Sequence, residues 1–180
     1  RGKGMKEWSQ KLLDLARKAK SDDQLEEYTG FIEGALPTAT LERTQRAALE
    51  QALYETYLQL NNWAYAIWHA CNLATHYMHS GDLKKAGDLF KSAYESSRLH
   101  GYHKGIIRAF IGLGNLVSTK NPVLACRFLY HAKQLSAKER SKWGIPASEK
   151  LREIQHDHAV RSSDFELKIS PDRLITEFEA

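Results

Sequence analysis

Cysteine and proline are scarce in this 180-residue chain, which has two of the first and four of the second. Two isolated thiols cannot build the disulfide framework of a small secreted domain. We therefore expect Cys71 and Cys126 to be buried thiols of a cytoplasmic protein. Because proline is rare while Ala, Leu and Lys are spread evenly, the composition favours helices.

Long apolar runs and a dominant charge are also missing. No run approaches the roughly 20 apolar residues that a membrane-spanning helix requires, so we expect no membrane partner. Lys and Arg number 26 against 22 Asp and Glu, which gives a net charge of +4. The basic runs are short and fall on different predicted helices, whereas a phosphate-binding surface needs them on one face. We therefore do not expect nucleic acid as a partner, and we interpret the net charge as that of a solvated surface.

Apolar residues at helical spacing, separated by turn residues, predict about eight helices of similar length. The expected helices cover residues 5–19, 22–36, 41–60, 63–78, 83–99, 104–119, 123–137 and 146–160. Ser21 is a predicted N-cap, Gly81 is suited to the left-handed position after a helix, and Gly101 is predicted to end the helix before it. No linker interrupts the series, so residues 1–160 are predicted to form one helical domain.

An internal repeat links two of the predicted helix pairs, about 40 residues apart. The first unit contains Leu73-Ala74, Tyr77, Gly81-Asp82 and Ala86-x-x-x-Phe90-x-x-Ala93, and the second contains Leu113-Gly114-Asn115, Lys120-Asn121 and Ala125-x-x-x-Leu129-x-x-Ala132. Ala74 and Gly114 would let the second helix of each pair approach closely. Phe90 could insert between neighbouring helices because an alanine lies one turn away on either side.

This pattern resembles the tetratricopeptide repeat, although Val117 stands where an aromatic residue is usual. The period exceeds the usual 34 residues. It is similar to the long-period repeats of bacterial regulators of the maltose-activator type and of eukaryotic polarity adaptors, for which the segment 96–101 is typical. The resemblance implies an all-α, right-handed α-solenoid of about eight helices, whose partners bind in a concave groove.

Metal binding and catalysis find little support in the sequence. His69, Cys71, His76 and His79 share one predicted helix, yet no acidic residue lies between positions 63 and 79, and no HExxH or CxxC motif occurs. Neither cysteine has the local signature of a nucleophile, and no GxSxG motif is present. We therefore expect no metal, no cofactor and no enzymatic activity.

The first helix of each pair lines the concave face of such a stack. Groove candidates are residues of these helices that do not carry the packing pattern: Trp68, Cys71, Asn72, Thr75 and His79, with Arg108, Ile111, Asn115 and Thr119. Asn72, Arg108 and Asn115 are similar to part of the set with which some family members hold a terminal carboxylate. Cys71 occupies a place where that set has a lysine. For Trp68, packing against the preceding helix is an equal alternative.

The last twenty residues, 161–180, form a tail of a different character. Phe165, Leu167 and Ile169 alternate with charged residues, which favours an extended segment. Ser170-Pro171 then predicts the start of a short helix whose apolar residues are Leu174, Ile175 and Phe178. An amphipathic tail of this kind predicts docking, either in the chain's own groove or against a second copy as a homodimer. The alternative is a link into a further domain.

Together these patterns predict a non-catalytic protein–protein interaction domain, an adaptor or scaffold. Its partner would be a peptide or a helix held in the concave groove. The alternative is the effector-sensing regulatory domain of a bacterial transcription or signalling regulator.

Overall fold

The structure is a computed structural model that describes residues 11, 14, 18, 19, 21–36 and 42–180. These residues form eight α-helices and no strand. The elements are α2 (Asp22–Ala35), α3 (Arg43–Gln59), α4 (Trp63–His79), α5 (Leu83–Leu99), α6 (His103–Val117), α7 (Pro122–Glu139), α8 (Gly144–His158), the short 3-10 helix η1 (Ser162–Asp164) and α9 (Pro171–Glu179). No helix in the described ranges is long and apolar enough to cross a membrane.

The predicted all-α class is confirmed, and most helix ends fall close to their expected positions. The helix expected over residues 5–19 lies largely outside the described residues. The one shifted start is that of α8, which begins at Gly144, so Pro146 lies inside its first turn instead of opening it. Pro146 needs no amide partner at that position, because the first amides of a helix have none within the helix.

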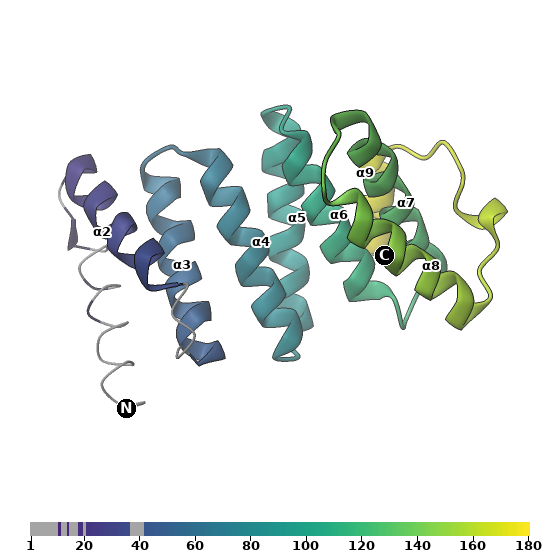
Figure 1. The fold of residues 1–180 in the computed structure, drawn as a ribbon, viewed down its shortest axis with the longest axis horizontal. Coiled ribbons are helices and arrows are strands. Elements are labelled where there is room, and N and C mark those ends of the chain that lie inside the picture. The colour runs from purple at the N-terminus through teal and green to yellow at the C-terminus, as the bar shows by residue number, and fades with distance from the viewer. Residues whose placement is uncertain (1–10, 12–13, 15–17, 20, 37–41) are drawn as a thin grey trace.

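Helices α2 to α8 lie side by side in a row, in the order in which they follow one another along the chain (Figure 1). Each helix from α2 to α8 contacts its neighbours in sequence, and α4 also contacts α6 directly. The first helices of the two repeat units, α4 and α6, therefore meet along one side of the row. One large apolar core runs from Ile67 to Ile175, and a smaller one joins α2, α3 and the start of α4.

One type of turn joins α3 to α4, α4 to α5 and α5 to α6. In each turn the second residue after the helix has positive φ: Asn61 (54°), Gly81 (87°) and Gly101 (64°). The amide of the following residue then donates to a carbonyl five residues back, at 2.8–2.9 Å. At two of the turns this residue, Asn62 or Asp82, also caps the next helix through its side chain. Turns at positions 61, 81 and 101 set the 40-residue period of a helix pair.

Glycines of α6 allow the close helix packing that the repeat pattern predicts. A Cβ atom at Gly114 would lie 2.8 Å from Leu129 Cγ of α7, and one at Gly112 would overlap the ring of Phe90 of α5. Phe90 and Leu129 are both buried, as are the alanines one turn away from them. The large residue of each unit therefore inserts against a small one of α6, as expected.

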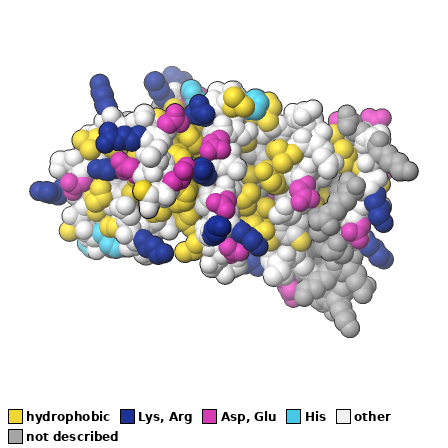
Figure 2. All heavy atoms as spheres, turned by 180° about the vertical axis from the view of Figure 1, so that it is seen from behind, with side chains coloured by type: hydrophobic (Ala, Val, Ile, Leu, Met, Phe, Trp, Pro, Cys, Tyr) yellow, Lys and Arg dark blue, Asp and Glu magenta, His cyan; other side chains and the backbone are white. Residues whose placement is uncertain are grey.

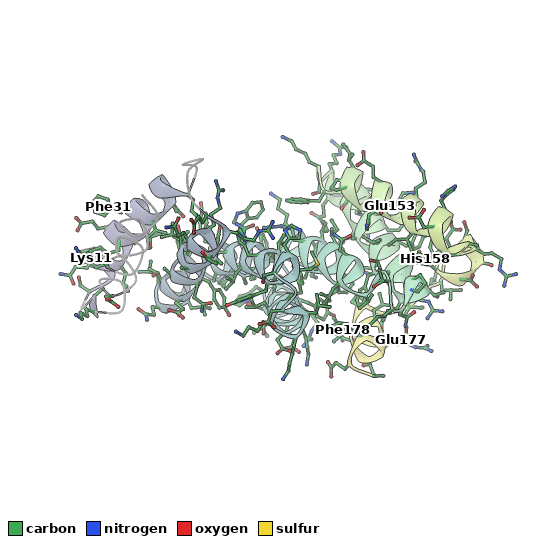
Figure 3. The ribbon with its side chains drawn as sticks, turned by 90° about the horizontal axis from the view of Figure 1, so that it is seen from below. Lys11, Phe31, Glu153, His158, Glu177 and Phe178 are labelled. Atoms are coloured by element: carbon green, nitrogen blue, oxygen red, sulfur yellow. The ribbon has the colours of Figure 1, made fainter. Side chains whose placement is uncertain are left out.

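The tail folds back on its own chain. Ser170 caps α9 and Pro171 occupies its first turn, as predicted. Helix α9 lies over α5 and α7, where Phe178 fills the space above Gly87 and meets the ring of Phe128. Polar contacts fix it at 2.6–3.1 Å: Tyr94 to Asp172, Lys91 to Glu179 and Arg127 to Glu177. Figure 3 shows Glu177 and Phe178 on one side of the row and Glu153 of α8 on the other.

Two expectations for the tail differ from the structure. The tail covers the second helices of the pairs, α5 and α7, and not the groove of the first helices; docking against a second copy stays a prediction. The alternation of residues 165–169 does not put all three apolar side chains on one buried face. Phe165 is 2% exposed, but Leu167 is 47% exposed because η1 and the irregular backbone after it turn this side chain outward.

Replacing Gly112 with alanine tests the close approach of α5 and α6. Because the added methyl group overlaps the buried Phe90 ring, we expect Gly112→Ala to lower the free energy of unfolding by about 1–3 kcal/mol. Gly34→Ala in α2 is the control, since no atom of the described residues lies within 4 Å of its Cβ position and alanine favours the helix by about 1 kcal/mol. Urea unfolding followed by circular dichroism measures both, and a Gly112→Ala variant as stable as the parent would contradict this packing.

A matched pair of leucines tests whether the tail is part of the core. Leu174 is 1% exposed, so Leu174→Ala should lower the free energy of unfolding by about 2–5 kcal/mol. Leu167→Ala removes the same atoms from an exposed position and should cost less than about 1 kcal/mol. Thermal and urea unfolding compare the two variants, and equal stabilities would show that α9 does not dock in solution.

Candidate functional site

The guanidinium group of Arg108 on α6 lies between two tryptophans. Its Cζ atom is 4.1 Å from the ring centroid of Trp68 on α4 and 4.9 Å from that of Trp143, which precedes α8. The two indole rings meet edge to face with centroids 6.2 Å apart. Cation–π contacts of this kind hold an arginine without a carboxylate partner. Arg108 thereby joins three segments that are far apart in sequence.

Hydrogen bonds complete the surroundings of Arg108. Its Nη1 donates to the backbone oxygen of Trp68 at 3.2 Å, and its Nη2 donates to Oδ1 of Asn72 at 2.9 Å. Asn72 in turn donates through Nδ2 to the Glu50 carboxylate at 3.3 Å. Asn72 therefore bridges the positive charge on α6 and a negative charge on α3 without direct contact between them.

The network continues through buried side chains to α2. Glu50 and His69 are both buried, and the carboxylate lies 2.6 Å from Nδ1 of the imidazole. The other ring nitrogen is 3.7 Å from Glu33, whose carboxylate accepts a hydrogen bond from the Tyr57 hydroxyl. Tyr57 stacks on both His69 and Tyr65, with centroids 5.5 and 5.1 Å apart. We call these residues the first-helix network, because α4 and α6 carry its centre. Its members are Tyr65, Trp68, His69 and Asn72 of α4, Arg108 of α6, Trp143, Glu50 and Tyr57 of α3, and Glu33 of α2.

Burial controls the electrostatics of this network. It lowers the pKa of Arg108, while the nearby thiol of Cys71 and the carboxylate of Glu50 act in the opposite direction. The pKa of Tyr57 is raised by burial first, and then by its hydrogen bond to Glu33 and by the charge of that carboxylate. Within the described residues Arg108 forms no ion pair, so its charge is balanced by indole faces and neutral acceptors.

The structure brings together three of the predicted groove residues, Trp68, Asn72 and Arg108. The Trp68 side chain is 40% exposed and contacts Arg108 and Trp143; packing of its covered part against the preceding helix stays a prediction. Thr75 lies one turn after Asn72 on α4, and its hydroxyl donates a hydrogen bond to the backbone oxygen of Cys71. His79 is exposed at the end of α4, where its backbone oxygen accepts a hydrogen bond from Arg43.

The remaining candidates lie elsewhere. Ile111 is 8% exposed and belongs to the large core, so it is not a groove residue. Asn115 keeps its side-chain oxygen buried without a hydrogen-bond partner among the described residues. Thr119 is exposed in the turn after α6, away from the network. Cys71 is buried behind Trp68 and Asn72 on the core side of α4.

Neither a metal nor a reactive thiol is indicated. In the part of the chain that the structure describes, no group of three or more His, Cys, Asp or Glu side chains could hold a metal ion. Burial raises the pKa of Cys71 to about 11, against a lowering effect of Arg108, and it raises the pKa of Cys126 to about 11 as well. A thiol with such a pKa remains protonated at neutral pH and is a poor nucleophile.

Sequence reasoning missed Trp143, Glu50, His69 and the two tyrosines as members of one network. On α4 a signal was present, because Tyr65, Trp68, His69 and Asn72 follow helical spacing and share one face. No comparable signal placed Trp143, which lies 35 residues beyond Arg108 in sequence. Only the position of the turn between α7 and α8 brings its indole to the guanidinium.

The basic side chains do not gather into one stripe on the face that Figure 2 shows. On its described part, Lys and Arg lie interspersed with Asp and Glu. Several basic side chains form ion pairs, among them Lys91 with Glu179 and Arg127 with Glu177. A surface of mixed sign does not follow the continuous negative charge of a phosphate backbone.

Comparison with protein-family models, curated proteins and solved structures found no match for this chain.

Replacing Asn72 with leucine tests the bridge between Arg108 and Glu50. Because the buried Glu50 and the half-buried Arg108 each lose a hydrogen bond, Asn72→Leu should lower the free energy of unfolding by about 1–3 kcal/mol. Thr75→Val is the control on the same helix, since the Thr75 hydroxyl bonds only its own helix backbone, and it should change stability by less than about 0.5 kcal/mol. Urea unfolding at pH 7 compares the variants. Equal stability of Asn72→Leu and the parent would show that the bridge contributes nothing in solution.

Proposed function

We propose that this chain is a non-catalytic protein–protein interaction domain that binds a peptide or a partner helix across α4 and α6. The observation that carries the proposal is the Trp68 indole, which is partly exposed yet held in place by Arg108 and Trp143. Tryptophan and arginine dominate the binding energy of protein interfaces. A side chain fixed before binding loses little conformational entropy when a partner covers it.

Exposed apolar neighbours extend the surface around Trp68. Tyr65 lies one turn earlier on α4 and is 54% exposed, and Ile145 of α8, next to Trp143 in sequence, is 66% exposed. Charged and polar groups of the first-helix network lie beneath these side chains and satisfy one another. An aromatic centre on a rigid polar support suits a binding surface better than a catalytic one, which would need groups free to react.

The repeat pattern supports the same proposal. If the chain is a tetratricopeptide-like, right-handed superhelix, the first helices of its pairs form the concave side. The direct contact of α4 with α6, together with α9 lying over α5 and α7, is consistent with that arrangement. The domain would then act as an adaptor or scaffold that recruits a partner segment.

A selection from a phage-displayed peptide library tests the proposal. Peptides selected on the purified chain should bind Trp68→Ala at least about tenfold more weakly than the parent, measured by isothermal titration calorimetry. Because Trp68 is partly exposed, this variant should remain folded, which circular dichroism checks.

Leu99→Ala is the control, since Leu99 is the most exposed large apolar residue of the described set and lies at the end of α5, away from the first-helix network. It should bind the selected peptides as the parent does. Failure to select any peptide, or selected peptides that bind Trp68→Ala with unchanged affinity, would contradict the proposed surface.

A further inference from the structure

A cavity of about 640 Å³ lies between α7 and the tail. Helix α7 forms its floor, residues 165–170 form its roof, and Leu174 of α9 closes one end. Its volume is within the range of about 300–1,000 Å³ that is usual for small-molecule sites. It is lined by none of the residues of the first-helix network, so it is a separate feature of the molecule.

The floor carries a row of polar side chains that the fold does not use. Arg127, His131 and Gln134 follow one another at helical spacing on α7, and Tyr130 lies beside them. Only Arg127 is engaged, by donating to the backbone oxygen of Asp164 at 3.0 Å and to Glu177 at 3.1 Å. In the described residues, the Tyr130 hydroxyl, the His131 nitrogens and the Gln134 amide have no hydrogen-bond partner; the His131 ring meets that of Phe110 edge to face.

Apolar side chains form the rest of the wall. Phe165 is buried against the ring of Tyr130, with centroids 5.6 Å apart, and Leu174 is buried at the end of the cavity. Ile169 is half-buried in the roof. A few convergent polar groups in a largely apolar cavity are the usual composition of a ligand site, in which the polar groups orient the ligand.

The lining residues themselves carry two positive charges and one negative charge. Arg127 and Lys168 are positive, and Glu166 is the only carboxylate among the lining residues. Lys168 has no ion-pair partner in the described part of the chain, whereas Arg127 is paired with Glu177. Burial lowers the pKa of His131, so its ring is neutral at pH 7 and can donate one hydrogen bond and accept another.

We propose that the cavity between α7 and residues 165–170 binds a small organic anion with an apolar body. The anionic group lies toward Lys168 and the α7 row, and the body lies against Phe165, Ile169 and Leu174. Because the roof belongs to the tail, a bound ligand stabilises the docking of the tail on α7. The proposal does not depend on peptide binding across α4 and α6.

Three probes of one shape and different charge test the site: 4-phenylbutyrate, 4-phenylbutan-1-ol and 4-phenylbutylamine. Titrations followed by amide NMR shifts of the full chain give the dissociation constants. We expect the carboxylate to bind about tenfold more tightly than the amine, with the alcohol between them. The amide signals of Tyr130, His131 and Phe165 should shift, and the indole signal of Trp68 should not.

A matched pair of lysines isolates the charge. Lys168→Gln should weaken carboxylate binding about two- to fivefold and leave alcohol binding unchanged. It should not change the melting temperature of the ligand-free protein, since Lys168 is exposed and unpaired. Lys133→Gln is the control, because Lys133 is exposed on α7 but does not line the cavity.

Any of four results would overturn the proposal: no binding of any probe, equal affinity for all three, shifts centred on Trp68, or Lys168→Gln behaving as Lys133→Gln does. None of these results would bear on peptide binding by the first-helix surface, which the Trp68→Ala comparison tests by itself.

Discussion

The contact between the Phe90 ring of α5 and the bare backbone of Gly112 on α6 is the constraint on which the rest of the structure depends. Because Gly112 has no side chain, α6 lies close enough to α5 for the ring to be buried, and Gly114 gives α7 the same access on the other side. This position of α6 brings it into contact with α4 as well. Arg108, one turn before Gly112, is thereby placed over Trp68. Close packing in the core and the arrangement of exposed aromatics thus have one cause.

The two sides of the row of helices differ in what covers them. On the side where α4 and α6 meet, polar groups from α2, α3, α4 and α6 satisfy one another beneath exposed aromatic rings. On the side of α5 and α7, the chain's own tail covers the helices and lines a half-open cavity against α7. A partner on the first side and a ligand on the second would contact different residues. The tail supplies a physical link, since it rests on α5, which packs against both α4 and α6.

Sequence patterns predicted the helices and their turns because these depend on local chemistry. Gly81 and Gly101 do adopt positive φ, and Ser170 does cap α9. The same reasoning misplaced Ile111, since it assumed that α6 has one free face. Helix α6 touches α4, α5 and α7, so only the narrow stripe that holds Arg108 stays accessible. It missed Trp143, and the alternation of residues 165–169 did not indicate that Leu167 is exposed, because both positions are set by irregular turns whose direction no periodicity encodes.

A partner that binds across α4 and α6, as proposed, covers Trp68 and Trp143 together. The chain has four tryptophans, so its indole NH signals can be assigned one by one in a ¹H–¹⁵N spectrum. Trp63 is an internal reference, because it stacks on His100 and meets Tyr102 edge to face, and is not part of the first-helix network. Titration with a library-selected peptide should shift the signals of Trp68 and Trp143 and leave that of Trp63 in place. A peptide that binds while the Trp68 and Trp143 signals stay unchanged would contradict the account.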